Sequence, residues 1–414
     1  MDLKRRISEF NYIIYDSIHT SIKHRDPDVV LIGGWMGTKF ADNSRFLYQY
    51  LFENKKLLGL KKVIWVTRDS SVNSLLHQLG YESYLIGSKD SNYWHLKAGI
   101  HIICNQHEEI PSMNLLPDID TKYSYGAKKI NLWHGVGMKS IGATSNADKR
   151  QSNINARVEW RRKHRFITSL ITCGGWSEGF FLCTSKANAR VNYNNSGQPK
   201  DRMFISSYPR NCKCLRLLAQ EEKIIAQIRQ YKGAILYLPT FRDKNSDYVH
   251  PLESEAICNL IKASGWVWVE KPHTADSERS KFKNRACPMI ELDSNFDINV
   301  LYDHVQCILS DYSSAAFDGA YRGLSTILYT PDIEQYKNGS GGLLPNYEEY
   351  LSALICKTED NLFKNISEVI DGNYLTEERR STLYKIRKDY FDNRDSSYEQ
   401  IWNDILRVIG LKKK

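Results

Sequence analysis

Short apolar runs recur along this chain, and most are followed by a segment with helical spacing. In the first half they lie at 28–35, 61–67, 84–86, 100–104, 129–133, 180–184 and 203–206, and in the second half at 234–239, 266–270, 305–309 and 326–329. Repeated strand–helix units predict parallel sheets with helices on both faces. Two such series, joined near residues 207–230, predict an α/β chain with two Rossmann-like, doubly wound domains that face a cleft.

The expected domains follow from this division. We place the first domain at 1–215 and the second at 216–375. Residues 376–414 are rich in Lys, Arg and Glu with periodic apolar positions, and they predict C-terminal helices. Ligands of doubly wound sheets bind at the carboxyl ends of the strands, so we look for function there.

The turn after the strand at 305–309 has the residues of an anion site. It reads SDYSS at 310–314, and small helix-forming residues follow. Free N–H groups and the helix dipole attract phosphate to such a helix start. Ser313 and Ser314 can cap the helix and also bond an anion, and Asp311 lies beside them. The same residues suit a plain N-cap, so this turn alone leaves both interpretations open.

Two histidines stand at strand ends. His134 follows a strand and precedes two glycines and Lys139, which suits a base next to a phosphate-binding loop. His273 also follows a strand, beside Lys271. Taken singly, a histidine in such a place is more often a structural hydrogen-bonding residue.

Two arginines follow other strands. Arg242 offers a planar fork for phosphate oxygens, with Asp243 next to it, although the two also suit a surface ion pair. Arg210 lies in the segment SYPRN at 207–211, which suits a plain turn as well. Together, the histidines, the cations and the serine turn fit pyrophosphate chemistry.

Several other reaction classes lack their signatures. The chain has no Gly-x-x-x-x-Gly-Lys-Ser/Thr loop, no Gly-x-Gly-x-x-Gly turn, no serine elbow and no zinc spacing. Asp243, Asp311 and Asp318 offer carboxylates for a divalent ion, but no pattern demands one. We therefore expect that neither a metal nor a cofactor is required.

Cysteine usage and hydropathy bear on the compartment. The nine cysteines are scattered without metal spacing, which predicts reduced thiols in the cytoplasm. No run of about 18 apolar residues occurs, and the N-terminal charges have no apolar core behind them. We expect neither a transmembrane helix nor a signal peptide.

The net charge of +9 favours polyanionic partners. No nucleic-acid module is recognisable, so we expect no nucleic acid among them. The basic segment 149–165 contains Arg161 and Arg162 and has partly amphipathic spacing. It suits a polyphosphate acceptor or an anionic lipid surface, and a solvated helix equally well.

Several motifs, taken together, resemble the CDP-glycerol glycerophosphotransferase family, which comprises teichoic acid polymerases and primases with their capsule-polymer relatives. The matching segments run in order from about residue 29 to 345. They are FADNSRFLYQYL at 40–51, LWHGVGMKSIG at 132–142, SYPRN at 207–211, LPTFRD at 238–243, KPH at 271–273, LSDYSSAAFD at 309–318 and ILYTPDIEQY at 327–336.

The resemblance implies a GT-B-like fold and an enzyme that uses a CDP-alditol as co-substrate. Such an enzyme transfers glycerol or ribitol phosphate to a hydroxyl of a lipid-linked or polymeric acceptor and releases CMP. The product is teichoic acid, capsule or a related surface polymer. The resemblance also implies peripheral attachment to the inner face of the cell membrane, with an anionic membrane surface as partner. The choice of alditol and acceptor and the presence of a homo-oligomer stay open.

Site residues also follow from the resemblance. The two histidines that the family requires fall on His134 and His273. Donor and phosphate contacts fall on Arg242, Ser313 and Ser314, with Asp311, Lys271, Arg210 and Lys139 as further candidates. On the acceptor side we place Lys39, Asn43, Arg161 and Arg162.

These assignments predict an in-line phosphoryl transfer. An acceptor hydroxyl attacks the β-phosphorus of the CDP-alditol, His134 takes the proton, and CMP leaves. His273, Arg242 and the serine turn stabilise phosphate charge. The roles of the two histidines are interchangeable on sequence alone. A nucleotide-sugar glycosyltransferase of the same shape is the nearest alternative, and a non-catalytic polyanion-binding protein is a more distant one.

Overall fold

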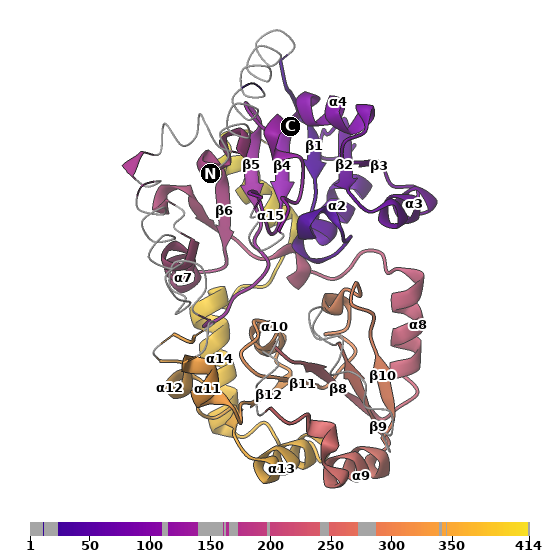
Figure 1. Cartoon of the computed structure of the whole chain (residues 1–414), viewed down its shortest axis with the longest axis vertical. Helices are drawn as coiled ribbons and strands as arrows, with labels where there is room; N and C mark the ends of the chain where they lie inside the picture. The colour runs from indigo at the N-terminus through magenta and orange to yellow at the C-terminus, as the bar shows by residue number, and fades with distance from the viewer. Residues whose placement is uncertain are drawn as a thin grey trace.

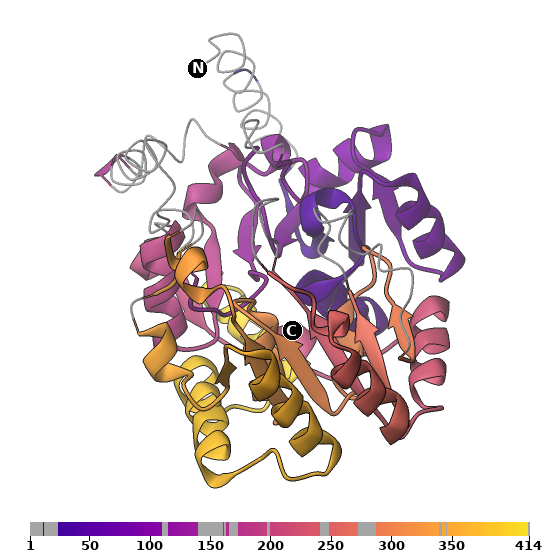
Figure 2. The same ribbon diagram turned by 60° about the horizontal axis from the view of Figure 1, so that its bottom comes forward.

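The structure is a computed structural model that describes residues 11, 24–109, 115–139, 160, 163–164, 173–196, 199–240, 248–271, 287–338, 342–344 and 346–412. Two separate sheets organise these residues, one above the other in Figures 1 and 2. The predicted α/β architecture with two doubly wound units is confirmed.

The first sheet has seven strands in the order β3-β2-β1-β4-β5-β6-β7, and each neighbouring pair is parallel. Its central strands read as continuous apolar runs because helices cover both faces. The strands are β1 (Asp26–Ile32), β2 (Lys62–Thr67), β3 (Ser83–Leu85), β4 (Ala98–Ile103), β5 (Lys128–Asn131), β6 (Phe180–Cys183) and β7 (Met203–Ile205).

The second sheet has six parallel strands in the order β10-β9-β8-β11-β12-β13. Every residue of β8 and β9 is buried. The strands are β8 (Gly233–Leu238), β9 (Trp266–Glu270), β10 (Met289–Glu291), β11 (Cys307–Ser310), β12 (Ser325–Tyr329) and β13 (Ile355–Cys356).

Several helices of the described residues start where the sequence offers a cap. Asp69, Ser254, Thr358, Thr376 and Ser397 each accept a hydrogen bond from a backbone N–H of the first turn of the helix that follows. The helices are α2 (Asp42–Glu53), α3 (Ser70–Gln78), α4 (Lys89–Lys97), α7 (Lys186–Ser196), α8 (Ala219–Ile228), α9 (Glu255–Ser264), α10 (Ala315–Tyr321), α11 (Ile333–Asn338), α12 (Tyr347–Tyr350), α13 (Glu359–Ile370), α14 (Glu377–Phe391) and α15 (Tyr398–Val408).

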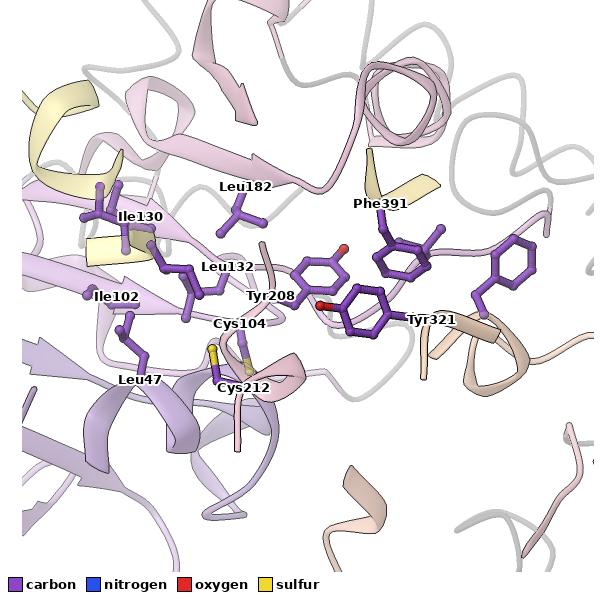
Figure 3. Packing of buried hydrophobic residues seen from close by; sticks show 14 of the residues in the cluster. Leu47, Ile102, Cys104, Ile130, Leu132, Leu182, Tyr208, Cys212, Tyr321 and Phe391 are labelled. Atoms are coloured by element: carbon purple, nitrogen blue, oxygen red, sulfur yellow. The ribbon is translucent and has the colours of Figure 1, made fainter. Parts of the chain in front are cut away.

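The last two helices carry the chain back from the second sheet to the first (Figure 1). Helix α14 packs on α10 and α7. The Ser206 hydroxyl, just after β7, donates to the Asp404 carboxylate of α15 at 2.8 Å. One apolar cluster therefore joins first-sheet residues such as Leu182 to Tyr321 of α10 and Phe391 of α14, with Tyr208 between them (Figure 3).

Before β11 the chain makes only a single 3-10 turn, Ile298–Val300, capped by the Asp297 side chain. The expected division near residue 215 lies between the last strand of the first sheet and the first of the second. The domain limits 1–215, 216–375 and 376–414 themselves stay a prediction.

Candidate functional site

Each sheet has a point where its strand order reverses. In the first sheet this point lies between β1 and β4, and in the second between β8 and β11. Loops at the carboxyl ends of such strands part there and make a natural binding position. The predicted site residues that the structure describes lie on these loops, on the loops next to them, or at the start of α2, except Arg210, which follows the edge strand β7.

The loop that carries His134, residues 132–139, follows β5 and is called the His134 loop here. Its start is fixed by side chains: the Trp133 N–H donates to the Asn131 side chain at 2.9 Å, and the Asn43 side chain donates to the Trp133 carbonyl at 2.7 Å. The rings of Trp133 and Trp35 lie 4.2 and 5.8 Å from the His134 ring. The imidazole therefore lies against two indoles.

The surroundings of His134 favour the neutral form of its imidazole. Burial, reinforced by the positive charge of Arg210, lowers the pKa of His134 to about 4. The side chain is not fully enclosed, since part of the residue stays accessible, yet its Nδ1 atom is buried with no hydrogen-bond partner among the described residues. A neutral imidazole can accept a proton, which is what a general base requires.

The His134 loop touches the second half of the chain at the serine turn, residues 311–314. A Cβ atom placed on Gly135 would lie 2.7 Å from the Ser314 hydroxyl and 3.0 Å from its Cβ. Ser314 immediately precedes α10 and makes no side-chain capping bond, whereas the Ser313 hydroxyl accepts from the Ala315 N–H at 3.3 Å. The structure thus brings Gly135, the residue after His134, against Ser314 of the other sheet.

Asp311 organises the turn rather than facing outward. Its carboxylate accepts from the N–H and the hydroxyl of Thr240, the latter at 2.6 Å, and so ties the end of β11 to the end of β8. The Lys139 ammonium donates to the same Thr240 hydroxyl at 3.1 Å. Lys139 therefore crosses from the His134 loop to the second sheet, where its charge lies near the serine turn.

Two lysines from opposite halves bind one short segment. Lys39 donates to the Ser294 carbonyl at 2.9 Å and Lys271 to the Phe296 carbonyl at 2.7 Å. Burial and the neighbouring charge of Lys39 lower the pKa of Lys271 to about 8, with Asp297 opposing the shift. The predicted donor-side and acceptor-side lysines thus lie near each other.

Arg210 is enclosed by charge. Its guanidinium donates to Asp42 at 2.9 Å and to Asp318 at 2.7 Å, and all three residues are almost completely buried. Burial raises the pKa of Asp42 to about 6, and Arg210 opposes the rise. The Arg210 N–H donates to the Asn43 side chain at 3.1 Å. Arg210 and Asn43, which the sequence predicted as ligands, therefore form hydrogen bonds with other residues of the protein.

Other predicted residues lie outside the described residues: His273, Arg242 with Asp243, and Arg161 and Arg162 of the basic segment. In the part of the chain that the structure describes, no three His, Cys, Asp or Glu side chains gather as metal ligands. Of the carboxylates considered for a divalent ion, Asp311 bonds Thr240 and Asp318 bonds Arg210.

Sequence reasoning missed some residues of the site. Thr240 joins the two central strands of the second sheet, Trp35 flanks His134, and Asp42 binds Arg210. All three lie directly after strands or at a helix start, so a search of every residue at a carboxyl strand end would have found Thr240 and Trp35. Asp42 carried no such signal beyond its place next to Asn43.

Comparison with known proteins gives a consistent result. A family model described as CDP-Glycerol:Poly(glycerophosphate) glycerophosphotransferase matches residues 16–406. The teichoic acid poly(glycerol phosphate) polymerase of Bacillus spizizenii is 23% identical over 90% of this chain and 91% of its own length. The teichoic acid ribitol-phosphate polymerase TarK of Staphylococcus aureus is 22% identical over 93% of this chain and 80% of its own.

Solved structures resemble the chain along almost all its length. The wall teichoic acid polymerase TagF matches with a TM-score of 0.70 and 17% identity over 99% of this chain and 95% of that one. A histidine-substituted TagF soaked with CDPG matches with a TM-score of 0.67 and 15% identity over 99% of both chains. Two other curated relatives are longer, and the chain covers 48% and 44% of them.

Proposed function

The chain belongs to the CDP-glycerol:poly(glycerophosphate) glycerophosphotransferase family, and on that premise we propose that it transfers an alditol phosphate from a CDP-alditol to an acceptor hydroxyl and releases CMP. The acceptor is a lipid-linked or polyol-phosphate chain of a teichoic acid or a related surface polymer. Its relatives include glycerol-phosphate and ribitol-phosphate polymerases, so both alditols are candidate donors.

One observation carries this proposal: the contact between the His134 loop and the serine turn. It joins a neutral imidazole to a turn with two hydroxyl groups at a helix start, from opposite sheets. Phosphoryl transfer needs a base next to the attacking hydroxyl and donors next to the phosphate oxygens. This pairing supports placing the reacting phosphorus between His134 and Ser313–Ser314.

In the proposed mechanism, His134 takes the proton of the acceptor hydroxyl as that oxygen attacks the β-phosphorus of the donor. The bond from this phosphorus to the bridging oxygen breaks, and CMP leaves with its electron pair. Ser313, Ser314 and Lys139 stabilise charge on the phosphates. His273 and Arg242 are proposed to act on the leaving phosphate, and the two histidines remain interchangeable as base.

The proposed surroundings are those of a cell-envelope enzyme. No helix among the described residues is both long and apolar enough to cross a membrane. We propose a place on the cytoplasmic face of the membrane, where anionic lipids attract a chain of net charge +9. Arg161, Arg162 and Lys39 are proposed to serve the acceptor side, whereas the buried Asn43 holds Trp133 and Arg210 instead.

The test is direct. Purified protein is incubated with CDP-glycerol, CDP-ribitol or UDP-sugars and a short polyol-phosphate acceptor, and the released nucleotide and the acceptor mass are measured. We expect CMP and an acceptor that is heavier by one or more alditol phosphates. Release of UDP alone, with a sugar added to the acceptor, would make the chain a glycosyltransferase instead.

A variant pair assigns the reaction to the site. His134→Gln should lower the turnover rate by about 100- to 10,000-fold, the usual contribution of a general base. His77→Gln is the matched control, because His77 is exposed on α3 and its side chain bonds the Ser83 carbonyl, away from the His134 loop. Near-normal turnover by His134→Gln would refute the proposed role.

A further inference from the structure

The guanidinium of Arg210 meets three different segments of the chain. It donates to the Asp42 carboxylate at the start of α2, to the Asp318 carboxylate in α10, and to the His134 carbonyl at 2.6 Å. Asp42 and His134 come from the first half and Asp318 from the second. Arg210 itself lies in the short turn Pro209–Asn211, after the last strand of the first sheet.

Helix α10 holds Arg210 at two points. Asp318 accepts from its side chain, and Arg322, one helical turn further on, donates to the Arg210 carbonyl at 3.0 Å. Residues four apart lie on the same face of a helix, so one face at the end of α10 bonds both the side chain and the backbone of Arg210. The serine turn directly precedes the same helix, so any shift of α10 relative to Arg210 also moves Ser313 and Ser314.

The same turn fixes the His134 loop. The Tyr208 hydroxyl donates to the Gly135 carbonyl at 3.1 Å, and Arg210 donates to the His134 carbonyl just before it. Two successive carbonyl groups of the loop are therefore held by Tyr208 and Arg210, two buried residues of one short segment. This anchors the backbone of His134 while the imidazole stays free of the turn's hydrogen bonds.

The charges around Arg210 argue against Arg210 as a direct ligand of phosphate. Two carboxylates balance its single positive charge, and the side chain is only 4% exposed. A phosphate that approached it would meet Asp42 and Asp318 as well. The buried arginine instead satisfies carboxylates that would be costly to leave unpaired.

We propose that Arg210 is a positioning residue that locks the His134 loop of the first half to helix α10 of the second. This inference rests on the proposed function for its catalytic meaning. It assigns Arg210 a task different from the phosphate contact that the sequence predicted. The distance between base and phosphate site is then set by one guanidinium, with Asp42 and Asp318 as its two anchors.

The test uses Arg210→Met and the milder Asp318→Asn, with Arg202→Gln as the control. Arg202 also pairs with a carboxylate, that of Glu178 at 2.7 Å, but both partners lie in the first half. Hydrogen exchange is followed in the segments 128–139 and 315–321. Both test variants should speed exchange in these two segments, and the control should leave them unchanged.

Kinetics distinguish positioning from binding. Displacing a reacting group by about 1 Å costs on the order of 100-fold in rate. We expect Arg210→Met to lower kcat by that amount while the KM for the CDP-alditol and the affinity for CMP stay near the wild-type values. A raised KM with unchanged kcat would make Arg210 a substrate ligand and overturn the proposal.

The outcomes separate the two hypotheses. Unchanged exchange at 128–139 in Arg210→Met would refute the positioning role whatever the enzyme's activity. If wild-type protein releases no CMP from either donor, the proposed function fails, and the exchange data still decide whether Arg210 holds the loop. If Arg210→Met does not fold, Asp318→Asn carries the same comparison, because it keeps an oxygen acceptor and removes only the charge.

Discussion

At the scale of single residues, strained backbone angles occur close to His134. Four residues near it or at the start of α2 have left-handed φ angles although none is glycine. Such angles cost about 1–3 kcal/mol each and persist where surrounding bonds enforce them. They are Trp35, Met36, Asp42 and Trp133, with φ of 47°, 59°, 63° and 59°. The first half of the chain therefore carries this conformational cost at the edge of its sheet where the proposed base, His134, lies.

The titration of His134 is a first residue-scale prediction. Its pKa lies at about 4 because burial and Arg210 both disfavour the charged imidazole. As the pH falls, the imidazole should stay neutral through 6.5 and gain its proton only near pH 4. NMR titration, with the signal assigned by its loss in His134→Gln, measures this midpoint. A midpoint near the ordinary 6.5 would contradict the buried environment.

The sequence predicted His134 and the serine turn as site residues because their motifs are local, and their function still awaits experiment. The sequence did not predict the surroundings of Arg210. Arg210 lies 168 residues from Asp42 and 108 from Asp318 in the chain. Only the packing of two sheets reveals that these two carboxylates cancel its charge.

At the scale of elements, apolar runs located most strands, since buried parallel strands are continuous in hydrophobicity. They missed β10 and β13, the two edge strands of the second sheet, which have three and two residues. Helix α13 was missed although its signal was present. Thr358 caps it, and Leu362, Ile366 and Val369 form its buried stripe.

The contact between the His134 loop and α10 predicts the effect of one methyl group. In Gly135→Ala the new Cβ would lie 2.7 Å from the Ser314 hydroxyl and 3.0 Å from its Cβ, so the loop and the turn must separate. We expect turnover to fall by about 10- to 100-fold, by misplacement of the base, with circular dichroism unchanged.

Gly137→Ala is the matched control in the same loop. Its Cβ would lie 3.6 Å from the Cβ of Ser314, an ordinary contact, so a much smaller loss is expected. Equal losses in the two variants would show that loop stiffness, rather than the contact with Ser314, limits turnover.

At the scale of the molecule, buried charge also joins the two halves. Arg45 of α2 donates to both oxygens of Glu221 in α8, at 2.5 and 2.8 Å, and neither side chain is accessible to solvent by more than 1%. Glu221 also accepts from the Leu218 N–H at the start of α8. Phe46, the next residue of α2, packs in an apolar cluster of the second sheet. Helix α2 therefore belongs to both halves.

Removing one partner of this pair should destabilise the whole protein. Arg45→Met leaves the Glu221 carboxylate buried and uncompensated, which costs about 3–5 kcal/mol. Urea unfolding followed by fluorescence measures the loss, and Arg45→Met/Glu221→Leu should recover part of it. The half-exposed pair of Lys62 and Glu82 is the control, since Lys62→Met should cost at most about 1 kcal/mol. Equal costs would contradict the importance of the α2–α8 pair.

The return of α15 to the first sheet has a consequence for biosynthesis. The apolar cluster around Leu182 includes Ile401, Trp402 and Ile405 of this helix. During translation the ribosome completes the strands of the first sheet long before it reaches residue 398. Until then one face of that sheet lacks part of its cover, and exposed apolar surface of this kind attracts chaperones or other nascent chains. We therefore expect the first half to complete its folding only once α15 has been made, rather than independently as it emerges from the ribosome.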